Sequence, residues 1–188
     1  MSNKLKVINL WAGPGAGKST TMALIFGTLK KRGINCEMAP EWIKWAAWEN
    51  RQKVFEEQGY ILQKQNWMLH RLKDKVEIAI SDSPLALCTA YSYLYDLGPY
   101  STETWRNHCF NVFNTYDNFN VFIERTKPYN GKGRNQSEDD AKKLDSIVLE
   151  TLQRHNVPFI TVRDGDTTHL DIIEMYEKEN GKIKKYFE

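Results

Sequence analysis

The sequence predicts an α/β protein: one domain with a parallel sheet covered by helices on both faces. Short apolar segments alternate with longer segments of helical periodicity along the 188 residues, and a glycine-rich turn joins the first pair. The length suits one domain, and no internal repeat, low-complexity segment or linker divides it. We therefore expect a single domain over residues 1–188 with a sheet of five strands.

The expected elements follow one another in a regular order. Apolar segments predict strands at 4–10, 34–38, 76–80, 120–123 and 159–162. Helical periodicity predicts helices from residue 18 to a C-cap at Gly33, from 40 to 75 with a break at Gly59, and at 85–97, 102–115, from 137 onward, and 168–178. Ser137 to Asp140 resembles a capping box, which opens the fifth of these helical segments.

The composition argues against several classes of protein. The chain has 26 basic and 24 acidic residues and a net charge of +2, so any basic surface for nucleic acid or membrane must be local. No apolar run approaches the roughly 20 residues of a membrane helix, and the first residues are too polar for a signal peptide. Three scattered cysteines indicate reduced thiols. We expect a cytoplasmic protein with no membrane partner, and its oligomeric state is not indicated.

A phosphate-binding motif follows the first strand. Residues 12–19 read Ala-Gly-Pro-Gly-Ala-Gly-Lys-Ser, which matches the Walker A pattern with alanine at its first position. Glycines at 13, 15 and 17 permit positive φ and leave no side chain between backbone and ligand. Successive N–H groups and the N-terminus of the next helix then favour an anion. The residues expected to bind ATP are Gly13, Pro14, Gly15, Ala16, Gly17, Lys18, Ser19 and Thr20.

Within this motif, Lys18 is expected to reach the β- and γ-phosphates, and the Ser19 hydroxyl to ligate Mg²⁺. A glycine-rich turn that binds nothing is the alternative, and the strand before it and helix after it argue against that. The Asn-Lys-x-Asp motif of GTPases is absent, and the chain is short for a ring-forming ATPase. The length fits a kinase of a small acceptor.

Two carboxylates follow strands at the sheet edge where open α/β sheets bind ligands. Asp82 follows the third strand and is expected to hold Mg²⁺ through water or to accept the acceptor's proton. The alternative is a helix cap, for which Ser83 is better placed because Pro84 follows it. Glu41 follows the second strand and is a second candidate base, or a solvated residue in the first turn of a helix.

Tryptophan is unusually dense after Glu41. Trp42, Trp45 and Trp48 share one loose helix face, which favours core packing. The alternative is that one of them stacks on a planar acceptor ring.

A basic segment lies between the fourth strand and the capping box. Residues 125–136 hold two glycines and four cations, Arg125, Lys127, Lys132 and Arg134. Phosphoryl transfer gains from cations around the developing charge and from exclusion of water, so we expect a lid, with Arg125 and Arg134 contacting phosphate. An ordinary solvated loop is the alternative. Residues 163–166 follow the fifth strand, and we expect them beside the phosphate loop if the strands take the common kinase order.

Together these segments resemble the P-loop nucleoside and nucleotide kinases. The glycine-rich loop, Asp82-Ser83-Pro84 after the third strand, and Arg125 through Gly133-Arg134-Asn135-Gln136 are similar to the ribosylnicotinamide-kinase-like group and to related phage-type kinases. The resemblance implies ATP, Mg²⁺ and a basic lid, with roles for Lys18, Ser19, Asp82, Arg125 and Arg134. Deoxynucleoside kinases also place a base after the second strand, as Glu41 would be, but usually carry Asp-Arg where this chain has Asp82-Ser83.

Three functions remain open from the sequence. The first is a kinase that transfers the γ-phosphate of ATP to a nucleoside- or nucleotide-like acceptor. The second is a kinase acting on a modified base, such as 5-hydroxymethyluracil, or on an end within DNA; the near-neutral charge makes DNA a less favoured partner. The third is an ATP-binding or ATPase regulatory module with no acceptor.

Overall fold

The computed structural model describes residues 4–126, 128–130 and 136–185. These residues form one five-stranded sheet in which all neighbouring strands run parallel, in the order β2-β3-β1-β4-β5. The strands are β1 (Lys6–Trp11), β2 (Cys36–Ala39), β3 (Ile78–Ser81), β4 (Asp117–Glu124) and β5 (Ile160–Arg163). The predicted α/β class, parallel sheet and number of strands are confirmed.

Nine helical segments connect or follow these strands within the described residues. The α-helices are α1 (Lys18–Lys31), α2 (Ile43–Trp48), α3 (Gln58–His70), α4 (Leu87–Leu94), α5 (Glu103–Phe113), α6 (Glu138–Arg154) and α7 (Thr168–Asn180), and the 3-10 helices are η1 (Gln52–Glu56) and η2 (Gly98–Ser101). None of these helices is both long and apolar enough to cross a membrane.

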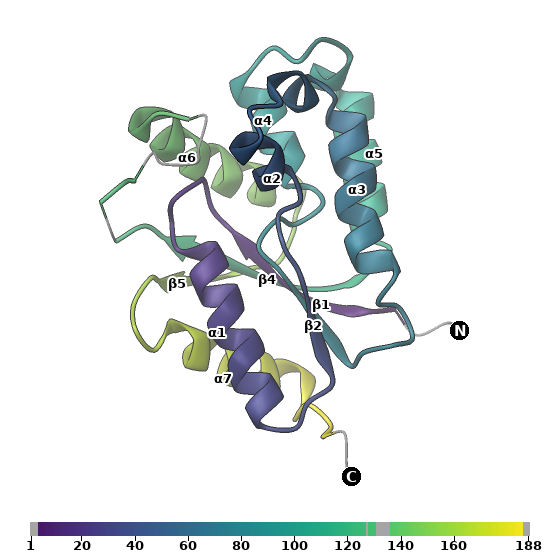
Figure 1. Cartoon of the computed structure of the whole chain (residues 1–188), viewed down its shortest axis with the longest axis vertical. Helices are drawn as coiled ribbons and strands as arrows, with labels where there is room; N and C mark the ends of the chain where they lie inside the picture. Colours follow the sequence, from purple (N-terminus) through teal and green to yellow (C-terminus); the bar gives the residue numbers. More distant parts are fainter. Residues whose placement is uncertain (1–3, 127, 131–135, 186–188) are drawn as a thin grey trace.

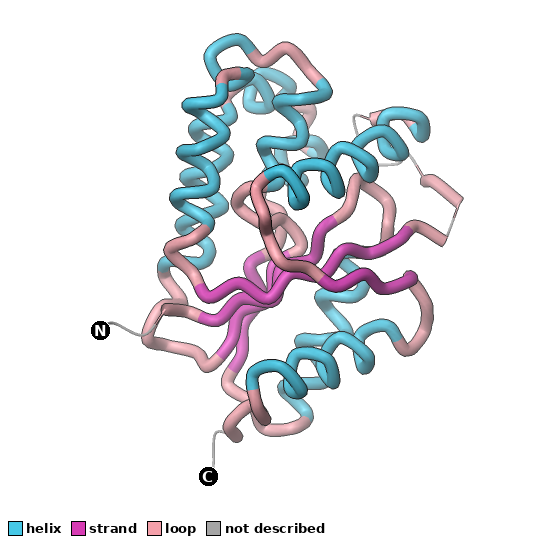
Figure 2. Tube along the Cα trace, turned by 180° about the vertical axis from the view of Figure 1, so that it is seen from behind, coloured by secondary structure: helices cyan, strands magenta, loops and turns pink. Residues whose placement is uncertain are grey.

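The sheet lies between two helical layers, as Figures 1 and 2 show. Alternate residues of β1 point to opposite faces, so Val7 and Trp11 pack with α3, α4, α5 and α6, while Ile8 and Leu10 pack with α1 and α7. Strands buried on both faces are the usual consequence of parallel crossovers. This arrangement brings the carboxyl ends of β1, β2 and β3 together at one edge.

Several predicted boundaries move. The break in the second helical segment lies between α2 and α3, where Asn50 adopts a φ of 56° and η1 intervenes, and not at Gly59. Gly59 lies inside α3, where a Cβ would approach the Tyr100 hydroxyl to 3.3 Å, so its role is packing. The predicted C-cap at Gly33 is confirmed by its φ of 75° immediately after α1.

The predicted capping box is also confirmed. The Ser137 hydroxyl accepts the backbone N–H of Asp140 at 3.1 Å, and the Asp140 carboxylate accepts the backbone N–H of Ser137. The box fixes the start of α6 and therefore the direction in which its buried face, with Leu144 and Val148, meets the sheet. All three cysteines are free thiols, as expected.

Candidate active site

The glycine-rich turn between β1 and α1 forms a phosphate-type loop, here called the P-loop (residues 12–19). Gly15 and Gly17 have φ of 81° and 96°, the left-handed region that glycine adopts without strain. Gly17 is the N-cap of α1, and no acidic residue lies in that helix's first turn. The N-terminus of α1 therefore presents unpaired N–H groups and a partial positive charge at the sheet edge.

Gly13 is required for a different reason from the one that the motif suggests. Its φ is not in the left-handed region, whereas a Cβ at this position would lie 2.6 Å from the carbonyl oxygen of Ala141 and 2.9 Å from Asp145 Oδ1, both on α6. The Gly13 N–H donates to Asp145 Oδ1 at 2.6 Å. The absence of a side chain therefore lets the P-loop pack directly on α6.

Lys18 is held within the P-loop itself. Its Nζ donates to the carbonyl oxygens of Ala12 and Gly13, both at 2.8 Å, and the residue is 9% exposed. Burial lowers the pKa of Lys18 from its ordinary value of 10.5, while the carboxylates of Glu41 and Asp82 act in the opposite direction. An anion beside this ammonium would replace the weak carbonyl partners with a charged one.

Asp82 lies directly behind the P-loop serine. The Ser19 hydroxyl donates to Asp82 Oδ2 at 2.5 Å, and the backbone N–H of Glu41 donates to Asp82 Oδ1 at 2.8 Å. Asp82 is 2% exposed, and each of its two carboxylate oxygens accepts one of these hydrogen bonds. The carboxylate joins the ends of β2 and β3 to the first turn of α1.

The helix-cap alternatives for Asp82 and Ser83 are wrong. α4 begins three residues after Pro84, at Leu87, with Ala86 as its N-cap and no capping side chain. A turn closed by the Leu87 N–H and the Pro84 carbonyl at 2.8 Å separates the acidic residue from the helix. Asp82 is therefore buried for a reason other than capping.

Arg125 extends from the end of β4 over the P-loop. Its guanidinium bonds Asp145 at 3.0 Å and donates to the Pro14 carbonyl at 2.8 Å. Its side chain is only 10% exposed, and Nη1 is buried with no hydrogen-bond partner among the described residues. Nη1 lies 3.1 Å from where a Gly15 Cβ would sit, so this donor lies close to the P-loop at Gly15, beside the Tyr129 ring. Lys127, Lys132 and Arg134 lie outside the described residues.

Sequence reasoning missed Asp145. It lies 132 positions from Gly13 in a helix whose pattern indicated only an amphipathic face, yet it holds both the P-loop backbone and Arg125. No local motif marks it, and its position follows only from how α6 packs on the sheet.

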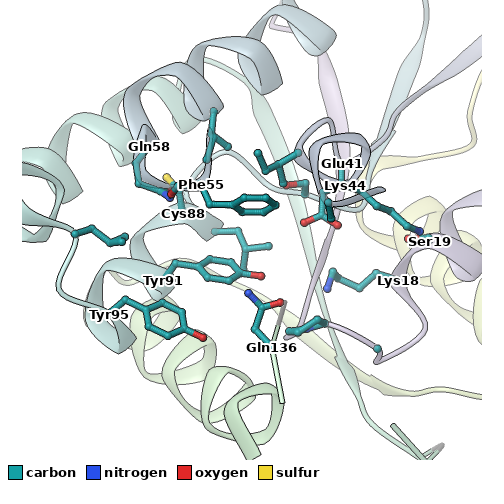
Figure 3. A pocket seen from close by; sticks show the side chains of 18 of the residues that line it. Lys18, Ser19, Glu41, Lys44, Phe55, Gln58, Cys88, Tyr91, Tyr95 and Gln136 are labelled. Atoms are coloured by element: carbon teal, nitrogen blue, oxygen red, sulfur yellow. The ribbon is translucent and has the colours of Figure 1, made fainter. Parts of the chain in front are cut away.

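A cavity of about 570 Å³ opens beside the P-loop. Its volume is within the range of small-molecule sites, roughly 300–1,000 Å³. One end is formed by P-loop residues, including Lys18 and Ser19, with Glu41 beside them (Figure 3). In this view the Glu41 carboxylate and the Lys18 ammonium both project into the cavity. The structure thus brings together Lys18, Ser19 and Glu41, while Asp82 stays behind them.

The other end of the cavity is aromatic and comes from segments without a recognisable motif. Phe55 of η1, Tyr91 of α4 and Tyr95, which directly follows α4, line it, and Gln136, just before α6, projects into it (Figure 3). Burial, with a further contribution from the Glu41 carboxylate, raises the pKa of Tyr91, so its phenol remains protonated at neutral pH. No ring contact joins Phe55 to Tyr91 within the described residues. Both rings border the same cavity.

Neither interpretation of the three tryptophans holds for Trp45 and Trp48. They are 53% and 63% exposed, so they are not core residues, and they do not line the cavity. The positions of α2 that do line it are Ile43, Lys44 and Ala47. The reason is the short length of α2, which buries only Ala46 and leaves most of its surface uncovered.

Residues 163–166 do lie beside the P-loop, as expected. A Cβ at Gly17 would lie 2.8 Å from the Asp164 carboxyl carbon. The Asp164 carbonyl accepts the Thr126 hydroxyl at 2.9 Å, which ties the end of β5 to the segment after β4. The two segments together border the P-loop on the side away from the cavity.

Comparison with known proteins agrees with this geometry. Residues 7–169 match a family model described as an AAA domain, AAA_28, which covers most of the chain. No curated protein has a sequence that matches this chain. The family match does not test whether this domain assembles into a ring. Our expectation that the chain is too short for a ring-forming ATPase therefore stays a prediction.

Three solved structures illustrate the similarity in fold. NadR in complex with NR matches with a TM-score of 0.71 at 14% identity over 96% of this chain, which spans about half of NadR (52%). Deoxyadenosine kinase from M. mycoides with bound dCMP matches with a TM-score of 0.56 at 20% identity, over 94% of this chain and 100% of the kinase. Thymidylate kinase from Candida albicans matches with a TM-score of 0.57 at 12% identity, over 96% and 95% of the two chains.

At these sequence identities, the similarity to the solved structures shows a shared fold only. The family match, in contrast, is a match of sequence and extends over residues 7–169. The sheet order, the P-loop after β1 and the acidic residue after β3 all agree with it. The chain therefore belongs to the AAA_28 family of P-loop AAA domains and has the α/β fold of the small P-loop kinases.

Proposed function

We propose that this protein is an ATP-dependent kinase that transfers the γ-phosphate to a nucleoside- or nucleotide-like acceptor. The observation that carries the proposal is the cavity, whose one end is the P-loop with Lys18 and whose other end is aromatic. A module that only binds or hydrolyses ATP has no use for an enclosed aromatic site adjoining its phosphate loop. A kinase needs such a site to hold the acceptor hydroxyl in line with the γ-phosphate.

ATP binds with its phosphates over the P-loop. The N–H groups of residues 15–19 surround the phosphates, and the Lys18 ammonium leaves its carbonyl partners for the β- and γ-oxygens. Arg125 adds the Nη1 donor close to Gly15, where it can reach a phosphate oxygen bound by the loop. Asp164 and Thr126 border the P-loop on the far side, toward the nucleoside of ATP.

The oxygen donors at the start of α1 fit Mg²⁺. Ser19 Oγ and Asp82 Oδ2 lie 2.5 Å apart, and hard oxygen ligands together with phosphate oxygens and water are what Mg²⁺ prefers. Ser19 would hold the ion directly, and Asp82 would hold it through water. The ion, when bound, neutralises charge on the β- and γ-phosphates as the bond between them breaks.

Glu41 is the better candidate for the base, because Asp82 is buried behind Ser19 and both of its oxygens already accept hydrogen bonds. The Glu41 carboxylate faces the cavity beside Lys18 (Figure 3). When the acceptor is an alcohol, its oxygen forms a bond to the γ-phosphorus, the bond from that phosphorus to the bridging oxygen breaks, and ADP leaves. The acceptor proton passes to the Glu41 carboxylate.

The acceptor's planar ring lies in the aromatic end of the cavity. Phe55 and Tyr91 both line this end of the cavity, and a heterocyclic base stacks on the Phe55 ring. The Gln136 amide and the neutral Tyr91 phenol supply hydrogen bonds at the ring edge. An aromatic site of this kind discriminates between acceptors mainly by their base and less by their sugar.

The test is a screen of ADP formation against nucleosides, nucleoside monophosphates, nicotinamide riboside and DNA with modified bases. We expect one of these classes to stimulate ADP formation well above the rate with ATP alone. Lys18→Ala protein, run in parallel, controls for contaminating kinases. ATP turnover equal with every acceptor and with none would identify a regulatory ATPase module and contradict the proposal.

A further inference from the structure

The outer surface of α2 and α3, next to the cavity, is unusually aromatic. Four large rings that other proteins would bury are exposed here, namely Trp45 (53%), Trp48 (63%), Tyr60 (45%) and Trp67 (60%). Figure 1 shows α2 close to the N-terminal end of α3, whose C-terminal end lies toward the amino ends of the strands. Exposed aromatic residues that lie near one another indicate an interaction surface.

Cations alternate with these rings on α3. Tyr60, Lys64, Trp67 and Arg71 follow one another at spacings of four, three and four residues, so they form a single stripe about 16 Å long along the helix. The Lys64 ammonium lies 5.3 Å from the Tyr60 ring centre. Within the described residues neither Lys64 nor Arg71 forms an ion pair with a carboxylate. These charges are therefore available to an anionic partner.

The short helix α2 connects this stripe to the cavity. Lys44 lines the cavity, and Trp48 lies one helical turn further along the same side of α2, outside it. Trp42, at the other end of α2, packs edge-on against Tyr60 with ring centres 5.2 Å apart. A chain leaving the cavity past Lys44 thus meets Trp48, and Trp42 links the start of α2 to the stripe on α3.

The surface charge favours one kind of partner. Residues 42–75 hold seven Lys or Arg against four Asp or Glu, whereas the whole chain has a net charge of only +2. Cations that track a backbone and aromatic faces that take successive bases are the two features of sites for single-stranded nucleic acid. A protein partner would not need the alternation of ring and cation.

We propose that the α2–α3 face, formed by Lys44, Trp45, Trp48, Tyr60, Lys64, Trp67 and Arg71, binds single-stranded nucleic acid, and that the acceptor in the cavity is a nucleotide of that strand. The proposal rests on the proposed kinase function for the role of the cavity, and it specifies the acceptor. The base bound in the aromatic end of the cavity remains attached to its neighbours, which stack on the α2–α3 face. The near-neutral total charge, which argued against DNA, conceals a local basic surface.

Binding is measured first, without ATP. A fluorescein-labelled oligothymidylate of about 20 nucleotides is titrated with wild-type protein, since single-strand sites cover roughly 4–16 nucleotides. We expect Trp67→Ala and Trp48→Ala each to weaken binding about 5- to 150-fold, the range for loss of one stacked base. Lys64→Ala should lower the slope of log K against log salt by about 0.7, the value for one phosphate contact on a single strand.

Matched controls lie on the opposite layer. Leu170→Ala and Lys178→Ala on α7 remove an exposed apolar side chain and an exposed cation, and neither should change binding. Wild-type tryptophan fluorescence supplies a measurement that needs no variant, and we expect the oligothymidylate to quench it. Oligothymidylate binding that is absent at low salt, or equal in Trp67→Ala and Leu170→Ala proteins, overturns the proposal.

Two other occupants give distinct results, and each contradicts the proposal. A duplex of the same length that binds as tightly as the single strand indicates a phosphate patch without stacking. A concentration-dependent dimer that Trp67→Ala dissociates, with unchanged oligothymidylate binding, indicates a contact between copies of this chain.

Failure of the proposed kinase activity gives a different result from failure of the proposed strand binding. Stimulation of ADP formation by a free nucleoside, with no oligonucleotide binding, supports the kinase activity and contradicts the binding of a nucleic-acid strand. Oligonucleotide binding that depends on Trp67, with no phosphate transfer to any acceptor, supports the α2–α3 face as a binding surface and contradicts the kinase activity.

Discussion

The two ends of the cavity are built in different ways. The phosphate end comes from eight consecutive residues, held by backbone hydrogen bonds and by two acids, the buried Asp82 and the partly exposed Asp145. The aromatic end comes from η1, α4 and the residue before α6, and side chains alone form it. Phosphate is the same in every nucleotide and a rigid backbone suffices to bind it, whereas the acceptor differs between enzymes and is selected by side chains that can change independently.

Substitution at the phosphate end should have the largest effect. Lys18→Ala is expected to lower kcat on the order of 10³-fold, because the ammonium stabilises charge that develops on the transferring phosphate. The far-ultraviolet circular dichroism spectrum should be unchanged, and Lys31→Ala, exposed at the end of α1, is the matched control. Full turnover of Lys18→Ala protein at saturating ATP would contradict the account of the phosphate end.

Glu41 lies where the two ends meet, so its effect should be intermediate. Glu41→Gln is expected to lower kcat about 10²-fold, the lower part of the range for a general base, since the nucleophile loses its proton late in a loose transition state. The KM for ATP should change little. Glu49→Gln, exposed just after α2, serves as control. An unchanged kcat would return the role of base to Asp82.

Substitution at the aromatic end should affect the acceptor and not ATP. Phe55→Ala is expected to raise the KM for the acceptor roughly 30-fold, the middle of the range for one stacked base, and to leave the KM for ATP unchanged. Steady-state kinetics with each substrate varied in turn separates the two. A parallel rise in both constants would mean that η1 supports the whole site and not the acceptor alone.

The smallest expected effect is on stability. Because burial lowers the pKa of Lys18 in the folded protein, the unfolded chain binds more protons between that lowered pKa and 10.5. Without ATP, stability should therefore rise with pH across this interval, and the deficit of wild type relative to Lys18→Met should be full below it and vanish above 10.5. Denaturant unfolding of both proteins at several pH values measures it. A deficit that grows with pH would mean that the charged form is favoured even without phosphate.

The sequence predicted the phosphate end because its information is local. The strand, the glycines at 15 and 17, Lys18 and Ser19 are contiguous, and backbone geometry follows from them directly. The order of the elements and the position of Asp82 followed from the same reasoning, since a parallel sheet gathers the ends of its strands at one edge.

The sequence could not predict the aromatic end. Phe55, Tyr91 and Gln136 meet only after η1, α4 and the start of α6 have packed, and no spacing relates them. Asp145 was missed for the same reason. The tryptophans were misinterpreted because hydrophobic residues at helical spacing usually face a core, while α2 is too short to bury more than one position.

The most direct test of the central claim, that the two ends act as one transferase site, follows the phosphate itself. Wild-type protein is incubated with ATP radiolabelled on its γ-phosphate, Mg²⁺ and the acceptor that stimulates ADP formation, and the products are separated. The account predicts that the label appears on the acceptor in amounts equal to the ADP formed, and that Phe55→Ala diminishes this transfer at low acceptor concentration. Label released only as inorganic phosphate, at the same rate with and without acceptor, would contradict it.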